Sequence, residues 1–210
     1  MPTDLDFIHQ FIAGSSNRTL LLLHGTGGDE NDLLPLGREL DPAAALLSPR
    51  GKVLENGYPR FFRRLAEGVF DLEDLKQRTD ELADFVVAAA GHYHFDARKL
   101  VAVGYSNGAN VAASILLRRP GVLPSAILLR AMVPFIPEEL PNLAGVRVWI
   151  AGGTQDMIIP RANTEQLVQM LTAAGAEVTA RFFDAGHALT NTELVQAKRW
   201  LAMLTPPGYN

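Results

Sequence analysis

The chain has 210 residues, of which 48% are hydrophobic and 20% are charged, and its formal net charge is −4. This length is enough for one α/β domain with a sizeable core, and this composition is typical of a soluble globular protein rather than a disordered one. The sequence contains no cysteine, which excludes disulfides, thiolate metal sites and a cysteine nucleophile. We therefore expect a single domain over residues 1–210.

The distribution of charge argues against nucleic acid or a membrane as a partner. No run of Lys and Arg and no basic stripe with interleaved aromatic residues is present, and the cluster of Arg60, Arg63 and Arg64 is too small to change this. The first residues lack the basic flank and apolar stretch of a signal peptide, and no apolar run is long enough to span a membrane. We expect a cytoplasmic protein without stable membrane insertion, and the sequence leaves open whether it forms a homodimer.

Strand and helix signals alternate along the whole chain. A weakly alternating stretch over Leu5–Ile12, a turn at Gly14–Asn17 and the apolar run Thr19–Leu23 predict a hairpin that leads into a buried strand. Further strands are expected over Ala44–Ser48, Leu100–Val103, Ser125–Leu129, Val146–Ile150 and Val178–Phe183. Helices are expected over Glu30–Leu40, Asp71–Ala90, Ala109–Arg119, Pro160–Ala174 and Leu194–Leu204. The looser stretch Pro49–Gly68 has no clean assignment.

The central strands are near-continuous apolar runs, which is typical of a parallel sheet covered on both faces. The expected fold class is therefore α/β, with a mostly parallel, doubly wound sheet and helices on both faces.

The pentapeptide Gly104-Tyr105-Ser106-Asn107-Gly108 lies where an apolar strand gives way to a small-residue helix. A Gly-x-Ser-x-Gly in this position is the nucleophile elbow of an α/β-hydrolase, in which the serine hydroxyl is exposed above the sheet edge. The two glycines are needed because the turn is tight and strained. Ser106 is therefore the candidate nucleophile.

A serine nucleophile needs a histidine as base, and the histidine needs an acid that orients it. In this fold the acid follows the serine along the chain, and the histidine follows the acid. Of the five histidines only His187 lies after Ser106, directly after the last expected strand. Asp156 ends a Gly-rich loop after the strand Val146–Ile150, where active sites of open parallel sheets collect. Asp184 lies only three residues before His187 and is interpreted as a turn former. The predicted triad is Ser106, Asp156 and His187.

The oxyanion of an ester intermediate needs donors, which in this fold are two backbone N–H groups. One is expected from Asn107, the residue after the nucleophile. The other is expected from Thr26 in the glycine-rich stretch His24–Gly28, which follows an early strand. His24 itself is interpreted as a structural hydrogen-bonding residue rather than a second base.

Two further clusters resemble metal sites and are interpreted otherwise. The acidic stretch Asp29–Asp32 is typical of helix capping, and His92–His94 is typical of the polar end of a helix. No metal site is expected.

Together these segments resemble the bacterial phospholipase/carboxylesterase family of α/β-hydrolases, which includes acyl-protein thioesterase-like enzymes. The matching segments are Leu22–Glu30, Gly104–Ala109, Gly152–Asp156 with Pro160, and Ala185–His187. The stretches Ser48–Gly51 and Arg60–Arg64 look like the carboxylesterases associated with hydroquinone resistance, whereas the eukaryotic thioesterases typically carry Gln where this chain has Asn107. The resemblance implies an α/β-hydrolase fold and an esterase that needs neither cofactor nor metal.

Apolar residues near the ends of strands are candidates for the substrate pocket, since such pockets are mostly apolar. The candidates are Phe61, Phe62, Leu65, Met132, Pro134, Phe135, Met157 and Ile158.

The expected function is a serine carboxylesterase that hydrolyses small to medium carboxylic esters through an acyl-enzyme intermediate, with a small-molecule ester as its partner. Two alternatives stay open. One is a lysophospholipase or acyl-protein thioesterase with the same triad, and the other is an inert hydrolase-fold protein that only binds a ligand.

Overall fold

A seven-stranded sheet forms the centre of the computed structural model, which describes residues 5–204. Its strands lie in the order β1-β3-β2-β8-β9-β10-β11, and only the β1–β3 pair is antiparallel. These strands are β1 (His9–Ile12), β2 (Thr19–Leu23), β3 (Ala45–Pro49), β8 (Leu100–Tyr105), β9 (Ser125–Leu129), β10 (Arg147–Gly153) and β11 (Glu177–Phe183).

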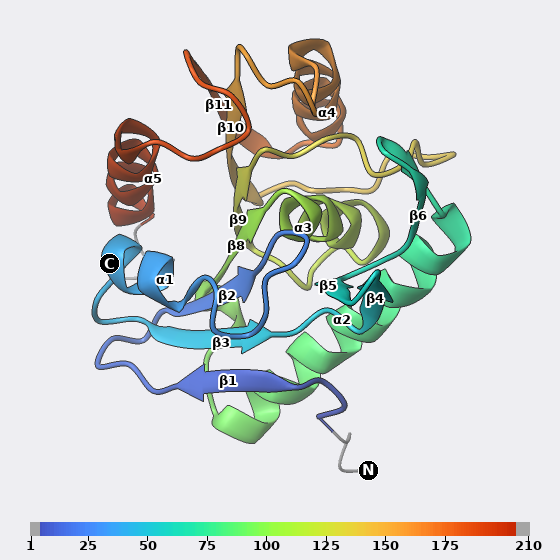
Figure 1. The fold of residues 1–210 in the computed structure, drawn as a ribbon. Helices are drawn as coiled ribbons and strands as arrows, with labels where there is room; N and C mark the ends of the chain where they lie inside the picture. The colour runs from blue at the N-terminus through green and yellow to red at the C-terminus, as the bar shows by residue number, and fades with distance from the viewer. Residues whose placement is uncertain (1–4, 205–210) are drawn as a thin grey trace.

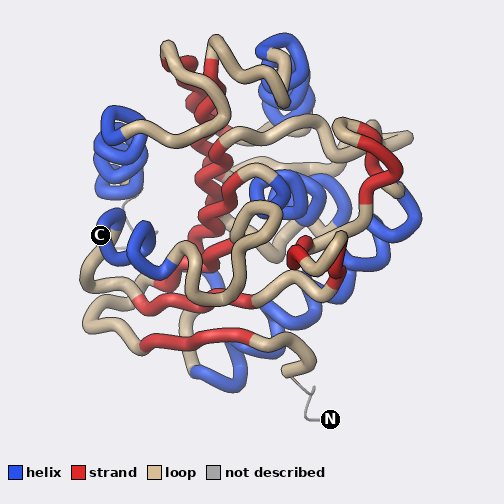
Figure 2. Tube along the Cα trace, in the orientation of Figure 1, coloured by secondary structure: helices blue, strands red, loops and turns tan. Residues whose placement is uncertain are grey.

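Helices cover both faces of this sheet, as Figures 1 and 2 show. The helices are α1 (Leu34–Leu40), α2 (Leu72–Tyr93), α3 (Asn107–Arg118), α4 (Arg161–Ala173) and α5 (Asn191–Met203), with a 3-10 turn over Ala97–Lys99. Helices α1 and α5 lie on one face, and α2, α3 and α4 lie on the other. Each face buries its own apolar cluster, since strand residues alternate between the two sides. The predicted mostly parallel, doubly wound α/β sheet is confirmed.

The stretch without a sequence assignment folds into two small hairpins beside the sheet. One pairs β4 (Val53–Glu55) with β5 (Tyr58–Arg60), and the other pairs β6 (Arg64–Ala66) with β7 (Val69–Phe70). Asn56 and Gly57 connect the first pair with positive φ angles of 52° and 84°. An Asn-Gly turn of this kind matches the twist of a two-residue hairpin, so the sequence did contain a signal for it.

The predicted N-terminal hairpin is wrong, because β1 pairs with β3 and not with β2. The N–H groups of Ser15 and Ser16 both donate to the carbonyl of Ala43, just before β3. The segment that connects β1 to β2 is therefore held against the start of β3. As a result, β2 pairs with the edge of β3 opposite to β1. The helix expected from Glu30 begins later, at Leu34, with a proline in its first turn.

No helix within residues 5–204 is long and apolar enough to cross a membrane.

Candidate active site

The turn between β8 and α3 places Ser106 in a strained backbone conformation. Its φ is 51° and its ψ is −114°, and its N–H donates to the carbonyl of Leu129 at 2.8 Å. A Cβ on Gly104 would lie 2.6 Å from the carbonyl oxygen of Gly108, and a Cβ on Gly108 would lie 1.9 Å from the carbonyl oxygen of Leu23. Because no side chain fits at either position, both glycines are required for the turn.

Ser106, His187 and Asp156 form a continuous chain of hydrogen bonds across three loops. The Oγ of Ser106 lies 2.9 Å from Nε2 of His187, and Nδ1 of His187 lies 2.8 Å from Oδ2 of Asp156. An ionised carboxylate only accepts, so Nδ1 carries the proton and Nε2 is free to accept from the serine. The structure thus brings together the three side chains that the sequence singled out.

The carboxylate of Asp156 is buried and well supplied with donors. Its side chain is 1% exposed, and its Oδ1 accepts from the N–H groups of Ile158 at 2.9 Å and Ile159 at 3.0 Å. Burial alone would raise the pKa of Asp156, but these N–H groups and the His187 ring outweigh it and hold the pKa below its ordinary value. Asp156 is therefore suited to remain ionised beside an imidazolium.

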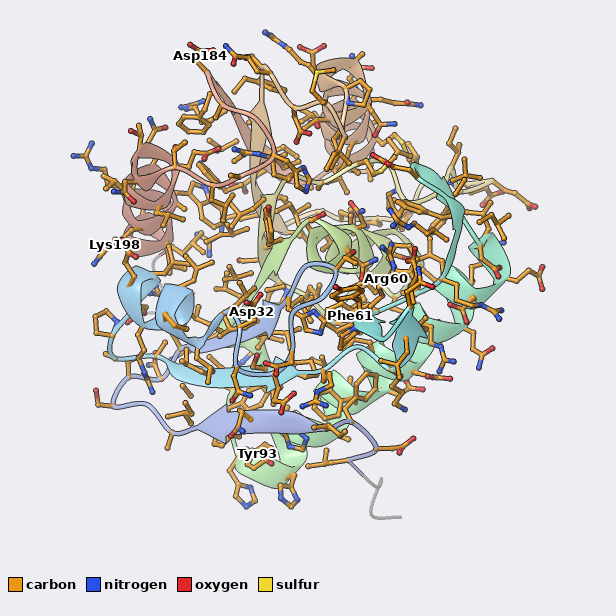
Figure 3. All side chains as sticks on the ribbon, viewed as in Figure 1. Asp32, Arg60, Phe61, Tyr93, Asp184 and Lys198 are labelled. Atoms are coloured by element: carbon orange, nitrogen blue, oxygen red, sulfur yellow. The ribbon has the colours of Figure 1, made fainter. Side chains whose placement is uncertain are left out.

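Asp184, which the sequence analysis interpreted as a turn former and not as the triad acid, makes no bond in this chain of hydrogen bonds. Its exposed carboxylate accepts from the side-chain amide of Gln155 at 2.6 Å and points outward at the far end of β11 (Figure 3).

The loop after β2 is held against the elbow by the β4–β5 hairpin. Nη1 of Arg60 donates to Oγ1 of Thr26 at 2.7 Å, and the N–H of Gly27 donates to the carbonyl of Pro59 at 2.9 Å. Arg60 and Phe61 lie beside α3 in Figure 3, and the N–H of Phe61 donates to Oδ1 of Asn107 at 2.7 Å. Thr26 and Asn107 thus lie on two segments tied to one another through the same hairpin.

The N–H of Asn107 is among the first four of α3, which lack an acceptor inside the helix. The Nδ2 of Asn107 is also buried without a hydrogen-bond partner. The oxyanion role of the Thr26 and Asn107 N–H groups stays a prediction.

His24 is structural, as predicted. Its Nδ1 donates to the carbonyl of Gly25 at 2.7 Å, and its Nε2 accepts from the N–H of Gly51 at 2.9 Å. The ring packs on Phe61, with the two centroids 4.6 Å apart. Burial lowers the pKa of His24 below its ordinary value of 6.5, so the neutral ring links the loop after β2 to the segment after β3.

A small cleft opens beside the serine. Its volume is about 40 Å³. Its lining residues come from the loop after β2, both hairpins, the elbow with the start of α3, and the loops after β9 and β10. They are Thr26, Arg60, Arg64, Glu67, Gly68, Phe70, Ser106, Asn107, Asn110, Met132, Ile158 and Ile159.

Of the eight apolar residues predicted for the substrate pocket, Met132 and Ile158 line this cleft. The other six lie elsewhere: Phe61 and Phe62 are buried in the core, Pro134 is buried, Phe135 packs against the core, and Leu65 and Met157 are 73% and 94% exposed. Both rings are buried, and the N–H of Phe61 bonds to Oδ1 of Asn107, which holds this backbone against α3.

The acidic stretch before α1 makes ordinary contacts. The Oδ1 of Asp29 accepts from the N–H of Asn31, and the carboxylate of Glu30 pairs with the guanidinium of Arg50. His92 lies in the last turn of α2 and His94 caps it. Over the described part of the chain, no group of three His, Asp or Glu residues is placed to hold a metal ion.

A guanidinium that the sequence analysis missed lies beneath the triad. Arg130 is fully buried and pairs with the equally buried Glu193. Two signals were present: Arg130 is a charged residue directly after an apolar strand, and Thr190 with Glu193 matches the capping-box pattern at a helix start. Neither signal indicates that the two side chains pair.

Known proteins are similar to this chain in sequence and in fold. The model of the dienelactone hydrolase family matches residues 53–200. A Bacillus subtilis (strain 168) protein named "Putative hydrolase MhqD" is 50% identical over 192 residues, which cover 91% of this chain and 96% of that protein.

Solved structures of two proteins are also similar to this chain in fold and sequence. The Bacillus cereus carboxylesterase has a TM-score of 0.92 and 51% identity, covering 94% of both chains. YahD, solved with malic acid, has a TM-score of 0.90 and 35% identity, covering 95% of this chain and 100% of its own. These likenesses confirm the predicted α/β-hydrolase fold and the predicted resemblance to carboxylesterases.

Proposed function

Since the chain belongs to the dienelactone hydrolase family and is an esterase-type hydrolase, we propose that it is a serine carboxylesterase acting through Ser106, His187 and Asp156. The observation that carries the proposal is the unbroken pair of hydrogen bonds from Ser106 through His187 to Asp156, at 2.9 and 2.8 Å. Its partner is a small-molecule ester, and its location is the cytoplasm.

Acylation begins when Nε2 of His187 takes the proton of Ser106 as Oγ attacks the ester carbonyl. The carbonyl π electrons move to oxygen, and the oxyanion is stabilised by the N–H groups of Thr26 and Asn107. The tetrahedral intermediate then collapses, the C–O bond to the alcohol breaks, and the imidazolium gives its proton to the leaving alkoxide. Asp156 stabilises the imidazolium throughout.

Deacylation repeats these steps with water. His187 takes a proton from water as the water oxygen attacks the acyl carbonyl, and the intermediate collapses with Oγ of Ser106 as the leaving group. His187 returns the proton to Oγ. The products are one carboxylic acid and one alcohol, and the enzyme is unchanged.

The size of the cleft favours short acyl groups. A volume of about 40 Å³ is far below the roughly 300–1,000 Å³ of pockets that enclose a drug-sized ligand. We therefore propose small to medium carboxylic esters as substrates. Among p-nitrophenyl esters we expect kcat/KM to peak at acetate or butyrate, whereas a peak beyond ten carbons would favour the lysophospholipase or thioesterase alternative.

The first test replaces the nucleophile. Ser106→Ala should lower kcat for p-nitrophenyl acetate by several orders of magnitude while the far-ultraviolet circular dichroism stays unchanged, because the attacking oxygen is removed. Ser114→Ala is the matched control, since it makes the same change further along α3, where Ser114 bonds Thr79 and not the triad. Unchanged turnover in Ser106→Ala would refute the proposal.

A further inference from the structure

We propose that Arg130, through its buried pair with Glu193, is a positioning residue that holds the His187 loop and balances the charge around the triad. This inference rests on the proposed function, because it assigns Arg130 a part in placing the base of that reaction.

The guanidinium of Arg130 clamps the loop on both sides of His187. Its Nε donates to the carbonyl of Gly186 at 2.9 Å, and its Nη2 donates to the carbonyl of Ala188 at 2.9 Å. The hydroxyl of Tyr105 donates to the carbonyl of His187 itself at 3.1 Å. Three successive carbonyls are therefore fixed by side chains that come from β8 and the end of β9.

The third nitrogen, Nη1 of Arg130, pairs with Oε1 of Glu193 in the first turn of α5. The other oxygen of Glu193 accepts from the N–H of Thr190 at 2.6 Å and from its hydroxyl at 2.9 Å, which closes the capping box of α5. One ion pair thus connects the end of β9 to the start of α5, with the His187 loop between them. Both side chains are fully buried, so this pair is little screened by solvent.

Arg130 occupies its position at a cost in backbone energy. Its φ is 59°, a left-handed conformation that is uncommon for residues other than glycine, and its N–H donates to the carbonyl of Ala151 at 2.9 Å. Such outliers persist where surrounding contacts hold them, and they cluster at functional sites.

The charges that face His187 nearly cancel when its ring is protonated. Asp156 and Glu193 are negative, and Arg130 is positive, with its Nε 3.8 Å from Oδ2 of Asp156. The Tyr105 phenol is neutral near pH 7, and burial raises its pKa further above the ordinary value of 10.0. The carboxylate of Asp32, in the loop before α1, also raises this pKa. The three buried charges sum to −1 beside a neutral imidazole and are balanced when the imidazole takes the proton of Ser106.

This balance predicts opposite effects of the two partners on the pH profile. Removing the negative charge of Glu193 disfavours a protonated His187, so the acid limb of kcat/KM should move to lower pH. Removing the positive charge of Arg130 favours a protonated His187, so the acid limb should move to higher pH. A shift of about one pH unit in each direction is expected when a buried charge close to the titrating group is removed.

The test measures kcat, KM and the pH profile for Glu193→Gln, Arg130→Gln, Arg130→Lys and the double variant Arg130→Gln/Glu193→Gln. The double variant keeps the site's charge sum and leaves no buried charge without its partner, which is the condition that makes removal of one member of a buried ion pair strongly destabilising. We expect its acid limb to stay near that of the wild type while kcat falls by tenfold to about a hundredfold, because the loop is no longer clamped. Arg130→Lys should also keep the acid limb and lower kcat.

The pair Arg18 and Asp41 supplies the matched control. It is a partly buried ion pair at 2.7 Å whose guanidinium also donates to a backbone carbonyl, that of Leu204. Arg18 directly precedes β2 and Asp41 caps α1, so the pair lies at the end of the strands opposite to the triad. Arg18→Gln/Asp41→Asn should change stability without changing kcat or the pH profile.

The positioning role is overturned if kcat of the folded double variant and of Arg130→Lys equals that of the wild type, or if the acid limb does not move in opposite directions in the two single variants. Failure of the proposed function is recognised separately, since Ser106→Ala would then retain the wild-type turnover.

Discussion

At the scale of single residues, the proposed chemistry depends on the tautomer of His187. Asp156 accepts from Nδ1 at 2.8 Å, and this leaves Nε2 free to accept the serine proton. An amide in place of the carboxylate could donate to Nδ1 instead, which would leave the proton on Nε2 and remove the base.

Asp156→Asn should therefore lower kcat for p-nitrophenyl acetate by roughly a thousandfold to ten-thousandfold, with KM little changed. Steady-state kinetics near pH 7 measure this. Asp184→Asn is the control, because that carboxylate is exposed and bonds Gln155 rather than His187. A kcat for Asp156→Asn within tenfold of the wild type would argue against an orienting role for the carboxylate.

Chain order made the triad residues recognisable in sequence, since one histidine and few acids follow the elbow. Arg130 and Glu193 could not be recognised in this way, because their pairing joins the end of β9 to α5 and depends on the folded loop between them. Of the predicted pocket residues only Met132 and Ile158 line the cleft, because a position after a strand does not say whether a side chain such as Phe62 points toward the cleft or into the core.

At the scale of elements, the turn from β8 to α3 is limited by space as much as by hydrogen bonding. Gly108→Ala should be strongly destabilising, because its Cβ would lie 1.9 Å from the carbonyl oxygen of Leu23, a backbone atom that cannot move without shifting β2. Thermal unfolding should show a large decrease in Tm or failure to fold.

Gly91→Ala is the contrasting change within α2. A Cβ there meets nothing within 4 Å, and alanine is favoured over glycine in a helix by about 1 kcal/mol, so Tm should rise. Equal effects of the two substitutions would contradict the close packing described for the elbow.

The regular elements were predictable because their apolar patterns are long. The two hairpins beside the cleft were not assigned, since their strands have two or three residues each and show no periodicity. The Asn56-Gly57 dipeptide was the one signal in the sequence that indicated the first of these hairpins. The pairing of β1 with β3 was not readable at all, because it depends on where residues 15 and 16 bond in the folded chain.

At the scale of the whole molecule, His24 makes stability depend on pH. Its folded pKa lies below 6.5 because the ring is buried, so the unfolded chain binds the proton more readily. The contribution of the neutral ring is fully present above about pH 6.5 and is lost as the pH falls toward the folded pKa.

We expect Tm to fall between about pH 7.5 and pH 5.5, and to fall less steeply in His24→Gln, which has no proton to take up. Differential scanning fluorimetry across this range measures both slopes. His92→Gln is the control, because that ring is exposed on α2. Equal slopes in the wild type and His24→Gln would contradict the linkage.

The central claim, that Ser106 is an activated nucleophile, is tested most directly by covalent labelling. A fluorophosphonate probe should add once to the folded protein, and peptide mapping should place the adduct on Ser106, with no adduct in Ser106→Ala or after heat denaturation. Absence of labelling in the folded wild type, or an adduct at another residue, would contradict the account and favour a protein that binds a ligand without turning it over.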